Sequence, residues 1–171
     1  DDTGVVTDRR AGRISTEKCE ELCELLSTIE VEGARIFVQP VKEYRFLLVI
    51  RGEGLSGEIH DTDPQVSGEK PLEPKAVLKS GEKTASIMAD FMSRAREKLS
   101  GHHPANMILT RGFYTRPDWP DFEEAFGLRA AAVAAYPMYR GVAKLVGMHP
   151  LQTKDNLENE IKTVKDSWDD F

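Results

Sequence analysis

The sequence predicts a mixed α/β fold, a single domain over residues 1–171 in which helices pack on a mixed sheet of about four to five strands. Three observations support this prediction. The chain has 171 residues, of which 40% are hydrophobic, and this suits one domain with a real core. Two neighbouring β-like runs predict a hairpin in the first half. In the second half, short strand-like runs alternate with helical segments.

The first expected elements are a helix and a hairpin. Ser15 or Thr16 can cap a helix that should end near Gly33. Its apolar positions follow the 3.6-residue period and are Cys19, Leu22, Cys23, Leu25, Leu26 and Ile29. The β-like runs 35–39 and 44–51 follow, and the short segment between them contains Pro40, so we expect an antiparallel hairpin. The second run includes FLLVI and should be a central strand.

A long loop and a second series of elements complete the expected fold. Residues 52–81 are rich in Gly, Pro and Asp and predict an ordered loop, a kind of segment that is usually functional or disordered. A helix is expected over 82–99, with an inward set of Ala85, Ile87, Met88, Phe91, Met92, Ala95 and Leu99. After it we expect strands over 106–110 and 129–134, and helices over 122–126, 137–146 and 154–168. Strands separated by helices need crossover connections, so some strands should pair in parallel.

Charge and composition exclude several classes of protein. The formal net charge is −6, from 29 acidic and 23 basic residues, which disfavours a nucleic-acid binder because such proteins need a basic face. No run approaches the roughly 20 apolar residues that cross a membrane, and the start of the sequence does not resemble a signal peptide, so we expect a cytoplasmic protein. Cys19 and Cys23 lie one helical turn apart and should be reduced, partly buried thiols.

Patterns that usually bind cofactors or metals are weak in this sequence. Gly52, Gly54 and Gly57 form G-x-G-x-x-G after a strand, but Pro64 and the aspartates before it cannot open the helix that would hold a pyrophosphate. Asp61 and Asp63 faintly resemble a calcium loop that lacks its acidic twelfth ligand. His102 and His103 are adjacent and make a poor metal pair. No serine lies in G-x-S-x-G. We therefore expect no metal ligand and no catalytic residue in this chain.

The arginines are more informative. Arg9, Arg10 and Arg13 fall in one short segment with a glycine, and guanidinium groups match carboxylate and phosphate oxygens in bidentate geometry. An exposed basic stretch is the alternative. Arg51 and Arg111 each end an apolar run and precede a glycine. If the two runs were neighbouring parallel strands, both arginines would reach the sheet edge where ligands of α/β proteins usually bind.

Three segments, taken in order, carry a resemblance to a known family. They are DRRAGR at 8–13, YRFLLVIRGEGLSGEIHDTDP at 44–64, and NMILTRGFYTRPDWPDFEEAFGLRAAAVAAYPMYRGVAKLVGM at 106–148. Together they are similar to the inserted domain of archaeal-type, 2,3-bisphosphoglycerate-independent phosphoglycerate mutases, over nearly the whole chain. The family consists of alkaline-phosphatase-like metalloenzymes with two manganese or magnesium ions and a serine that carries the phosphoryl group.

The resemblance implies a role for the chain in glycolysis and gluconeogenesis, as part of an enzyme that interconverts 3-phosphoglycerate and 2-phosphoglycerate. The inserted domain would close over the substrate and exclude water. The family's DG-x-x-D and GHDG segments are absent from this sequence. We therefore expect the metal ions, the nucleophile and the phosphatase-like catalytic domain in other parts of the same polypeptide. The chain alone should be inactive.

By this resemblance, four arginines and three aspartates should contact the substrate: Arg9, Arg13, Arg51, Arg111, Asp8, Asp61 and Asp63. Asp61 and Asp63 could instead organise the long loop by accepting hydrogen bonds from its backbone amides. Two other functions stay open. The chain could belong to another phosphomutase of the same superfamily, or it could be a free-standing anion-binding or interaction domain without an enzymatic parent.

Overall fold

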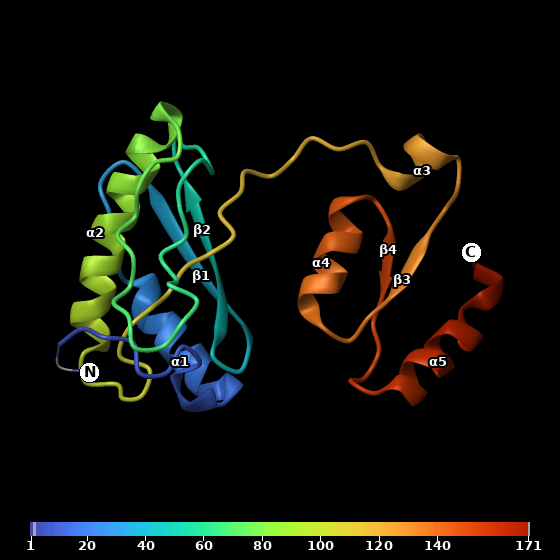
Figure 1. The fold of residues 1–171 in the computed structure, drawn as a ribbon. Helices are drawn as coiled ribbons and strands as arrows, with labels where there is room; N and C mark the ends of the chain where they lie inside the picture. The colour runs from blue at the N-terminus through green and yellow to red at the C-terminus, as the bar shows by residue number, and fades with distance from the viewer. Residues whose placement is uncertain (2, 171) are drawn as a thin grey trace. The chain divides into compact units, whose positions relative to one another are not determined.

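The computed structural model describes residue 1 and residues 3–170, and it divides the chain into two compact units, 1–115 and 116–171. That residues 1–171 act as one inserted domain stays a prediction. The mixed α/β class is confirmed. The four strands of the described residues form two sheets of two strands each, one antiparallel and one parallel (Figure 1).

The first unit is built on an antiparallel hairpin covered by two helices. Its strands are β1 (Arg35–Lys42) and β2 (Arg45–Arg51), and its helices are α1 (Thr16–Ser27) and α2 (Glu82–Leu99). Two short 3-10 turns, η1 (Ala11–Arg13) and η2 (Lys79–Gly81), precede the helices. Helix α1 packs on β1 and against α2. The hairpin is the predicted one, but β2 is not a central strand, since among the described residues it pairs with β1 alone. Pro40 lies inside β1, opposite Phe46, next to a bulge.

The inward faces of the two helices were predictable. Ser15 caps α1, and its side chain accepts a hydrogen bond from the backbone of Lys18. All seven predicted inward residues of α2 are buried, and Phe91 and Met88 have no exposed surface. Helix α1 ends at Ser27, earlier than expected. The hydroxyls of Ser27 and Thr28 donate to backbone carbonyls of the last helical turns and compete there with the helical pattern.

The predicted strand over 106–110 is wrong. In place of a ladder, the backbone of Thr110 is held by Thr62: its carbonyl accepts from the Thr62 amide at 2.8 Å, and its amide donates to the Thr62 hydroxyl at 2.9 Å. Thr62 thus makes, with its side chain and its own amide, the hydrogen bonds that a neighbouring strand would make with Thr110. Consequently Arg111 does not end a strand, and the sheet edge that it was expected to share with Arg51 does not form.

The second unit has a parallel pair of strands joined through a helix. Its elements are α3 (Phe122–Phe126), β3 (Ala131–Val133), α4 (Pro137–Leu145), β4 (His149–Leu151), α5 (Leu157–Asp166) and the 3-10 turn η3 (Trp168–Asp170). The crossover β3–α4–β4 confirms the predicted parallel pairing. Strand β4 was not predicted, because three residues with a central proline give no β pattern.

Candidate functional site

Arg9 and Asp63 form the most ordered charged contact of the first unit. Arg9 Nε donates to Asp63 Oδ1 at 2.8 Å and Arg9 Nη2 donates to Asp63 Oδ2 at 2.5 Å, a parallel two-bond fork. Asp63 is buried, with 8% of its surface exposed, and Oδ1 also accepts from the Gln65 amide at 2.9 Å. The hydrogen bond from Arg9, joined by the Gln65 amide and the charge of Arg111, lowers the pKa of Asp63. The fork ties residue 9 to the long loop.

The turn after Arg9 has an unusual backbone. Ala11, Gly12 and Arg13 all have positive φ angles, of 50°, 62° and 54°. Only glycine adopts this conformation without steric cost. The Asp8 carboxylate supports the turn, since its two oxygens accept from the amides of Arg10 and Gly12, both at 2.7 Å. These two backbone hydrogen bonds lower the pKa of Asp8. The left-handed turn fixes where Arg13 leaves the backbone.

Gly12 also marks a close approach between two segments. A Cβ atom added at Gly12 would lie 2.7 Å from Cγ of Pro104. The segment around His103, for which the sequence predicted no role, therefore packs on the arginine-rich turn. Strained backbone persists only where neighbouring structure holds it in place, and it is enriched at functional sites.

Asp61 and Arg111 belong to the same region of the first unit. Asp61 Oδ1 accepts a hydrogen bond from the Gly112 amide at 2.8 Å, so this carboxylate holds the segment that carries Arg111. The charge of Arg111 also contributes to the lowered pKa of Asp63, after the hydrogen bonds from Arg9 and the Gln65 amide. Asp63 thus accepts from an amide within the long loop, whereas Asp61 accepts from an amide outside it, next to Arg111.

Arg13 and Arg51 have weaker contacts. Arg13 Nη1 lies 3.7 Å from a Glu43 oxygen, and Arg45 Nη1 approaches the same oxygen at 3.2 Å. Arg51 lies at the end of β2, where its guanidinium is 5.1 Å from the ring centre of Phe37, and its cross-strand partner Arg35 lies 5.6 Å from that ring. Both guanidinium groups lie on an aromatic face, a cation–π arrangement.

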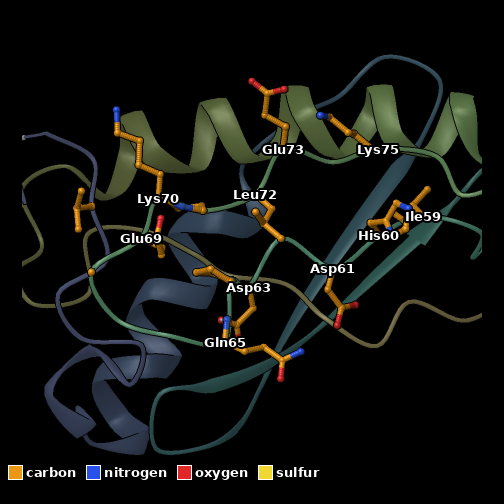
Figure 2. Close-up of a pocket in the computed structure, with 14 residues that line it drawn as sticks. Ile59, His60, Asp61, Asp63, Gln65, Glu69, Lys70, Leu72, Glu73 and Lys75 are labelled. Carbon is orange, nitrogen blue, oxygen red and sulfur yellow. The ribbon is translucent and has the colours of Figure 1, made fainter.

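An open pocket of about 1080 Å³ lies along the long loop (Figure 2). Figure 2 shows Asp61, Asp63 and Gln65 together in the lower part of the view, and Glu73 and Lys75 in the upper part. The wall contains four carboxylates and two lysines, and none of the four predicted arginines is among its lining residues. Its acidic balance does not suit a phosphorylated substrate.

In residue 1 and residues 3–170, no group of three or more His, Cys, Asp or Glu side chains is placed to hold a metal ion. Among the same residues, no helix combines the length and the apolar character needed to span a membrane.

Sequence comparisons decide the family. The model of 2,3-bisphosphoglycerate-independent phosphoglycerate mutase matches residues 1–106, more than half of the chain. The chain belongs to this family. It is 42% identical to a probable 2,3-bisphosphoglycerate-independent phosphoglycerate mutase of Thermotoga neapolitana, over 99% of the chain and 43% of that protein. It is 41% identical to the corresponding protein of Aquifex aeolicus, over 98% of the chain and 43% of that protein.

Solved structures agree with this family. The structure of a cofactor-independent phosphoglycerate mutase from Thermoplasma acidophilum matches this chain with a TM-score of 0.68 and 30% sequence identity. The match covers 97% of this chain and 48% of the Thermoplasma chain. The resemblance inferred from the three sequence segments is thus confirmed. The chain spans less than half the length of the curated phosphoglycerate mutases that it matches.

The matched region contains six of the seven predicted site residues, and Arg111 lies beyond it. The fold brings Arg9 and Asp63 into direct contact, Asp8 holds the turn that follows Arg9, and Asp61 holds the Gly112 amide next to Arg111. Arg51 instead stacks on Phe37. Glu43, Thr62 and Gln65 were not predicted, because each makes its contact only once the loops have folded.

Proposed function

We propose that this chain is part of a 2,3-bisphosphoglycerate-independent phosphoglycerate mutase, and that its first unit grips the phosphoglycerate substrate. The observation that carries the proposal is the Arg9–Asp63 fork. It joins the DRRAGR segment to the DTDP segment, 54 residues apart, and both segments lie within the region matched by the family model. A rigid junction of this kind positions neighbouring guanidinium groups for an anion.

The seven residues take two roles in this proposal. Arg13, Arg51 and Arg111 supply positive charge to the carboxylate and phosphate of the substrate, because their guanidinium groups have weak contacts or none in the described structure. The Arg9–Asp63 pair holds the junction between the two segments. The side of the Arg9 guanidinium that does not face Asp63 is available to bind a substrate oxygen. Asp8 and Asp61 fix the two backbone segments that carry Arg13 and Arg111.

The chemical step belongs to other parts of the proposed enzyme. Because no metal-binding cluster occurs among the described residues, the two manganese or magnesium ions and the serine nucleophile would lie outside the 171-residue chain. The described residues would bind and orient the glycerate while the phosphoryl group moves between its two positions. The 171-residue chain should then show no mutase or phosphatase turnover, even with added manganese.

Kinetics of arginine variants test the proposal. In the full-length enzyme, we expect Arg13→Ala and Arg111→Ala each to lower kcat/KM for 3-phosphoglycerate about 10-fold to 150-fold, the equivalent of losing one charge-assisted hydrogen bond of about 1.5–3 kcal/mol. Arg94→Ala is the matched control, since Arg94 is exposed and pairs with Asp90 on α2. It should retain wild-type turnover.

Two results would contradict the proposal. If both variants stay within about twofold of wild type, these arginines do not grip the substrate. If the full-length protein turns over pentose phosphates in preference to 3-phosphoglycerate, the chain belongs to a different phosphomutase. Robust metal-dependent turnover by the 171-residue chain itself would place the nucleophile within it.

A further inference from the structure

We infer that the Glu43 carboxylate is an internal substitute for a ligand anion, and that Arg45 is a further anion-binding residue of the first unit. Glu43 lies between Arg13 and Arg45, at the position where a carboxylate or phosphate group of a ligand would bind. Such a ligand would displace the Glu43 side chain. The inference rests on the proposed function for the identity of the ligand, a phosphoglycerate, and it adds a binding residue and a side chain that competes with the substrate.

Two guanidinium groups converge on one oxygen atom of Glu43. Arg45 Nη1 donates to Oε2 at 3.2 Å, and Arg13 Nη1 lies 3.7 Å from the same atom. The two arginines come from separate segments, since Arg13 ends η1 and Arg45 begins β2. Two positive charges held this close repel each other unless an anion lies between them. The position of Oε2 therefore favours an oxyanion of any source.

The contact of Glu43 with Arg13 is loose enough to be exchanged. Its distance of 3.7 Å is longer than a hydrogen bond, and the side chain of Arg13 is 56% exposed and that of Glu43 36% exposed. Exposed ion pairs of this kind contribute little to stability. The Arg9–Asp63 fork differs, because both of its bonds are short and Asp63 is buried. A ligand oxyanion within hydrogen-bond distance of both guanidinium groups would therefore replace Glu43 and leave the fork intact.

The turn of the hairpin is held through the backbone of Glu43 and not through its carboxylate. Glu43 and Tyr44 are the two residues between the cross-strand partners Lys42 and Arg45. The Glu43 amide donates to the Thr16 hydroxyl at 2.9 Å, which ties the turn to the first residue of α1. Because this bond uses only the amide, the carboxylate can move away from the two arginines while the turn keeps its position.

Both residues of the looser contact lie on unfavourable backbone. The φ angle is 54° at Arg13 and 51° at Glu43. In two-residue hairpin loops, a position with positive φ favours glycine, asparagine or aspartate, so glutamate breaks the local preference. Residues that break such a preference are expected where function requires their side chains. The backbone of Glu43 thus supports a role for its carboxylate beyond the turn.

Arg45 is held in position by its neighbours. Its guanidinium lies 4.5 Å from the ring centre of Tyr44, a cation–π contact, and its backbone carbonyl accepts a weak hydrogen bond from the Cys19 thiol at 3.6 Å. A guanidinium that rests on a ring keeps its N–H groups available for an oxyanion. Because the side chain is already ordered, Arg45 loses little conformational freedom when an anion binds.

Titrations with inorganic phosphate and with glycerate test this inference. In NMR spectra of the 171-residue chain, the Nε–H signals of Arg13 and Arg45 report binding at these two residues. We expect Glu43→Gln, which keeps the side-chain shape and removes the charge, to bind at least one probe about threefold to tenfold more tightly than wild type, because the competing carboxylate is gone. A gain for phosphate alone identifies the phosphate group of the substrate as the bound anion. A gain for glycerate alone identifies its carboxylate.

Further variants separate local competition from a general effect of charge. Arg45→Ala should weaken binding of the same anion at least about tenfold, and in that background Glu43→Gln should change the affinity by less than about twofold. The control is Glu21→Gln, which removes an exposed carboxylate paired with Lys18 on α1 and should change the affinity by less than about twofold. The inference is overturned if Glu43→Gln binds both anions no more tightly than wild type, or if its gain is undiminished in the Arg45→Ala background.

Kinetics of the full-length enzyme give a second measurement. Glu43→Gln should lower KM for 3-phosphoglycerate about threefold to tenfold and leave kcat unchanged, because the substrate no longer displaces a carboxylate. A purely structural role of Glu43 would instead leave KM unchanged or raise it, and in an active enzyme either result overturns the inference. The titrations need no turnover. An enzyme without mutase activity would therefore contradict the proposed function alone, and unchanged anion affinities would contradict this inference alone.

Discussion

Arg9 and Asp63 are joined by two parallel hydrogen bonds although 54 residues separate them in the chain. The pair is partly buried, and Asp63 also accepts from the Gln65 amide. Gln65 itself has a positive φ of 61°, as do the residues of the turn after Arg9. The fork therefore connects two segments with strained backbone, and each segment is held in place through the other.

Removing the negative charge of this pair should destabilise the first unit. We expect Asp63→Asn to lower the free energy of unfolding by about 1–3 kcal/mol, because Arg9 loses its charged partner while the buried position remains polar. Chemical denaturation of the 171-residue chain measures the change. The control is Asp90→Asn, which breaks an exposed Asp90–Arg94 pair and should cost less than about 0.5 kcal/mol. Equal effects of the two substitutions would show that the fork adds nothing beyond a surface ion pair.

The same pair predicts a dependence of stability on pH. The pKa of Asp63 is lowered in the folded protein, chiefly by the hydrogen bond from Arg9. A carboxylate with a lowered folded pKa contributes stability above its unfolded pKa, about 3.9, and that contribution disappears as pH falls through the folded value. Wild type should therefore lose more stability than Asp63→Asn on acidification below about pH 4. Parallel curves for the two proteins in urea unfolding would contradict this prediction.

Sequence periodicity predicted the elements that bury one apolar face. Helix α2 begins at Glu82 and ends at Leu99 as expected, and the antiparallel hairpin forms between the two predicted β-like runs. Those elements depend on local spacing. The strand expected over 106–110 failed because Thr62, far away in the chain, replaces the strand neighbour with a hydroxyl and an amide. Side-chain hydrogen bonds between distant loops leave no periodic pattern.

The sequence indicated which types of residue would form the candidate site, but it did not indicate which of them would be in contact. The arginine-rich segment suggested an anion site, and the structure joins Arg9 to Asp63. Nothing in the sequence indicates that Asp8 would stabilise a left-handed turn, or that Gly12 would lie against Pro104. Both facts depend on backbone angles set by tertiary packing, for which residue identity alone is only a weak guide.

Thr62 should be more important for stability than its size suggests. It has no exposed surface, and its hydroxyl lies 2.8 Å from the Thr110 hydroxyl and accepts from the Thr110 amide. Thr62→Val keeps the shape but leaves those groups without a partner, so we expect a loss of about 1–3 kcal/mol in thermal or chemical unfolding. Thr28→Val removes an exposed hydroxyl that donates to Leu25 and should cost distinctly less. Similar losses of stability for the two variants would show that burial of the hydroxyl does not increase its contribution to stability.

Gly12→Ala should destabilise the arginine-rich turn. The added methyl group would meet Pro104 at 2.7 Å, and the φ angle of 62° costs a non-glycine residue about 1–2 kcal/mol. Gly101→Ala is the matched control, because no atom lies within 4 Å of the added Cβ. Calorimetry should show a lower unfolding midpoint for Gly12→Ala alone. A midpoint equal to that of wild type would mean that the turn adapts without strain.

The two cysteines should resist alkylation while the protein is folded. Cys19 and Cys23 are buried with their sulfur atoms 3.9 Å apart, and burial raises the pKa of both thiols, that of Cys23 to about 12. Only the thiolate reacts with iodoacetamide, and an unperturbed thiol has a pKa of about 8.5, so at mildly alkaline pH the folded protein should react at least about 100-fold more slowly than the protein in denaturant. Mass spectrometry after timed quenching measures both rates. Rapid labelling of the folded chain would show that α1 separates from the hairpin, since these thiols lie on its buried face.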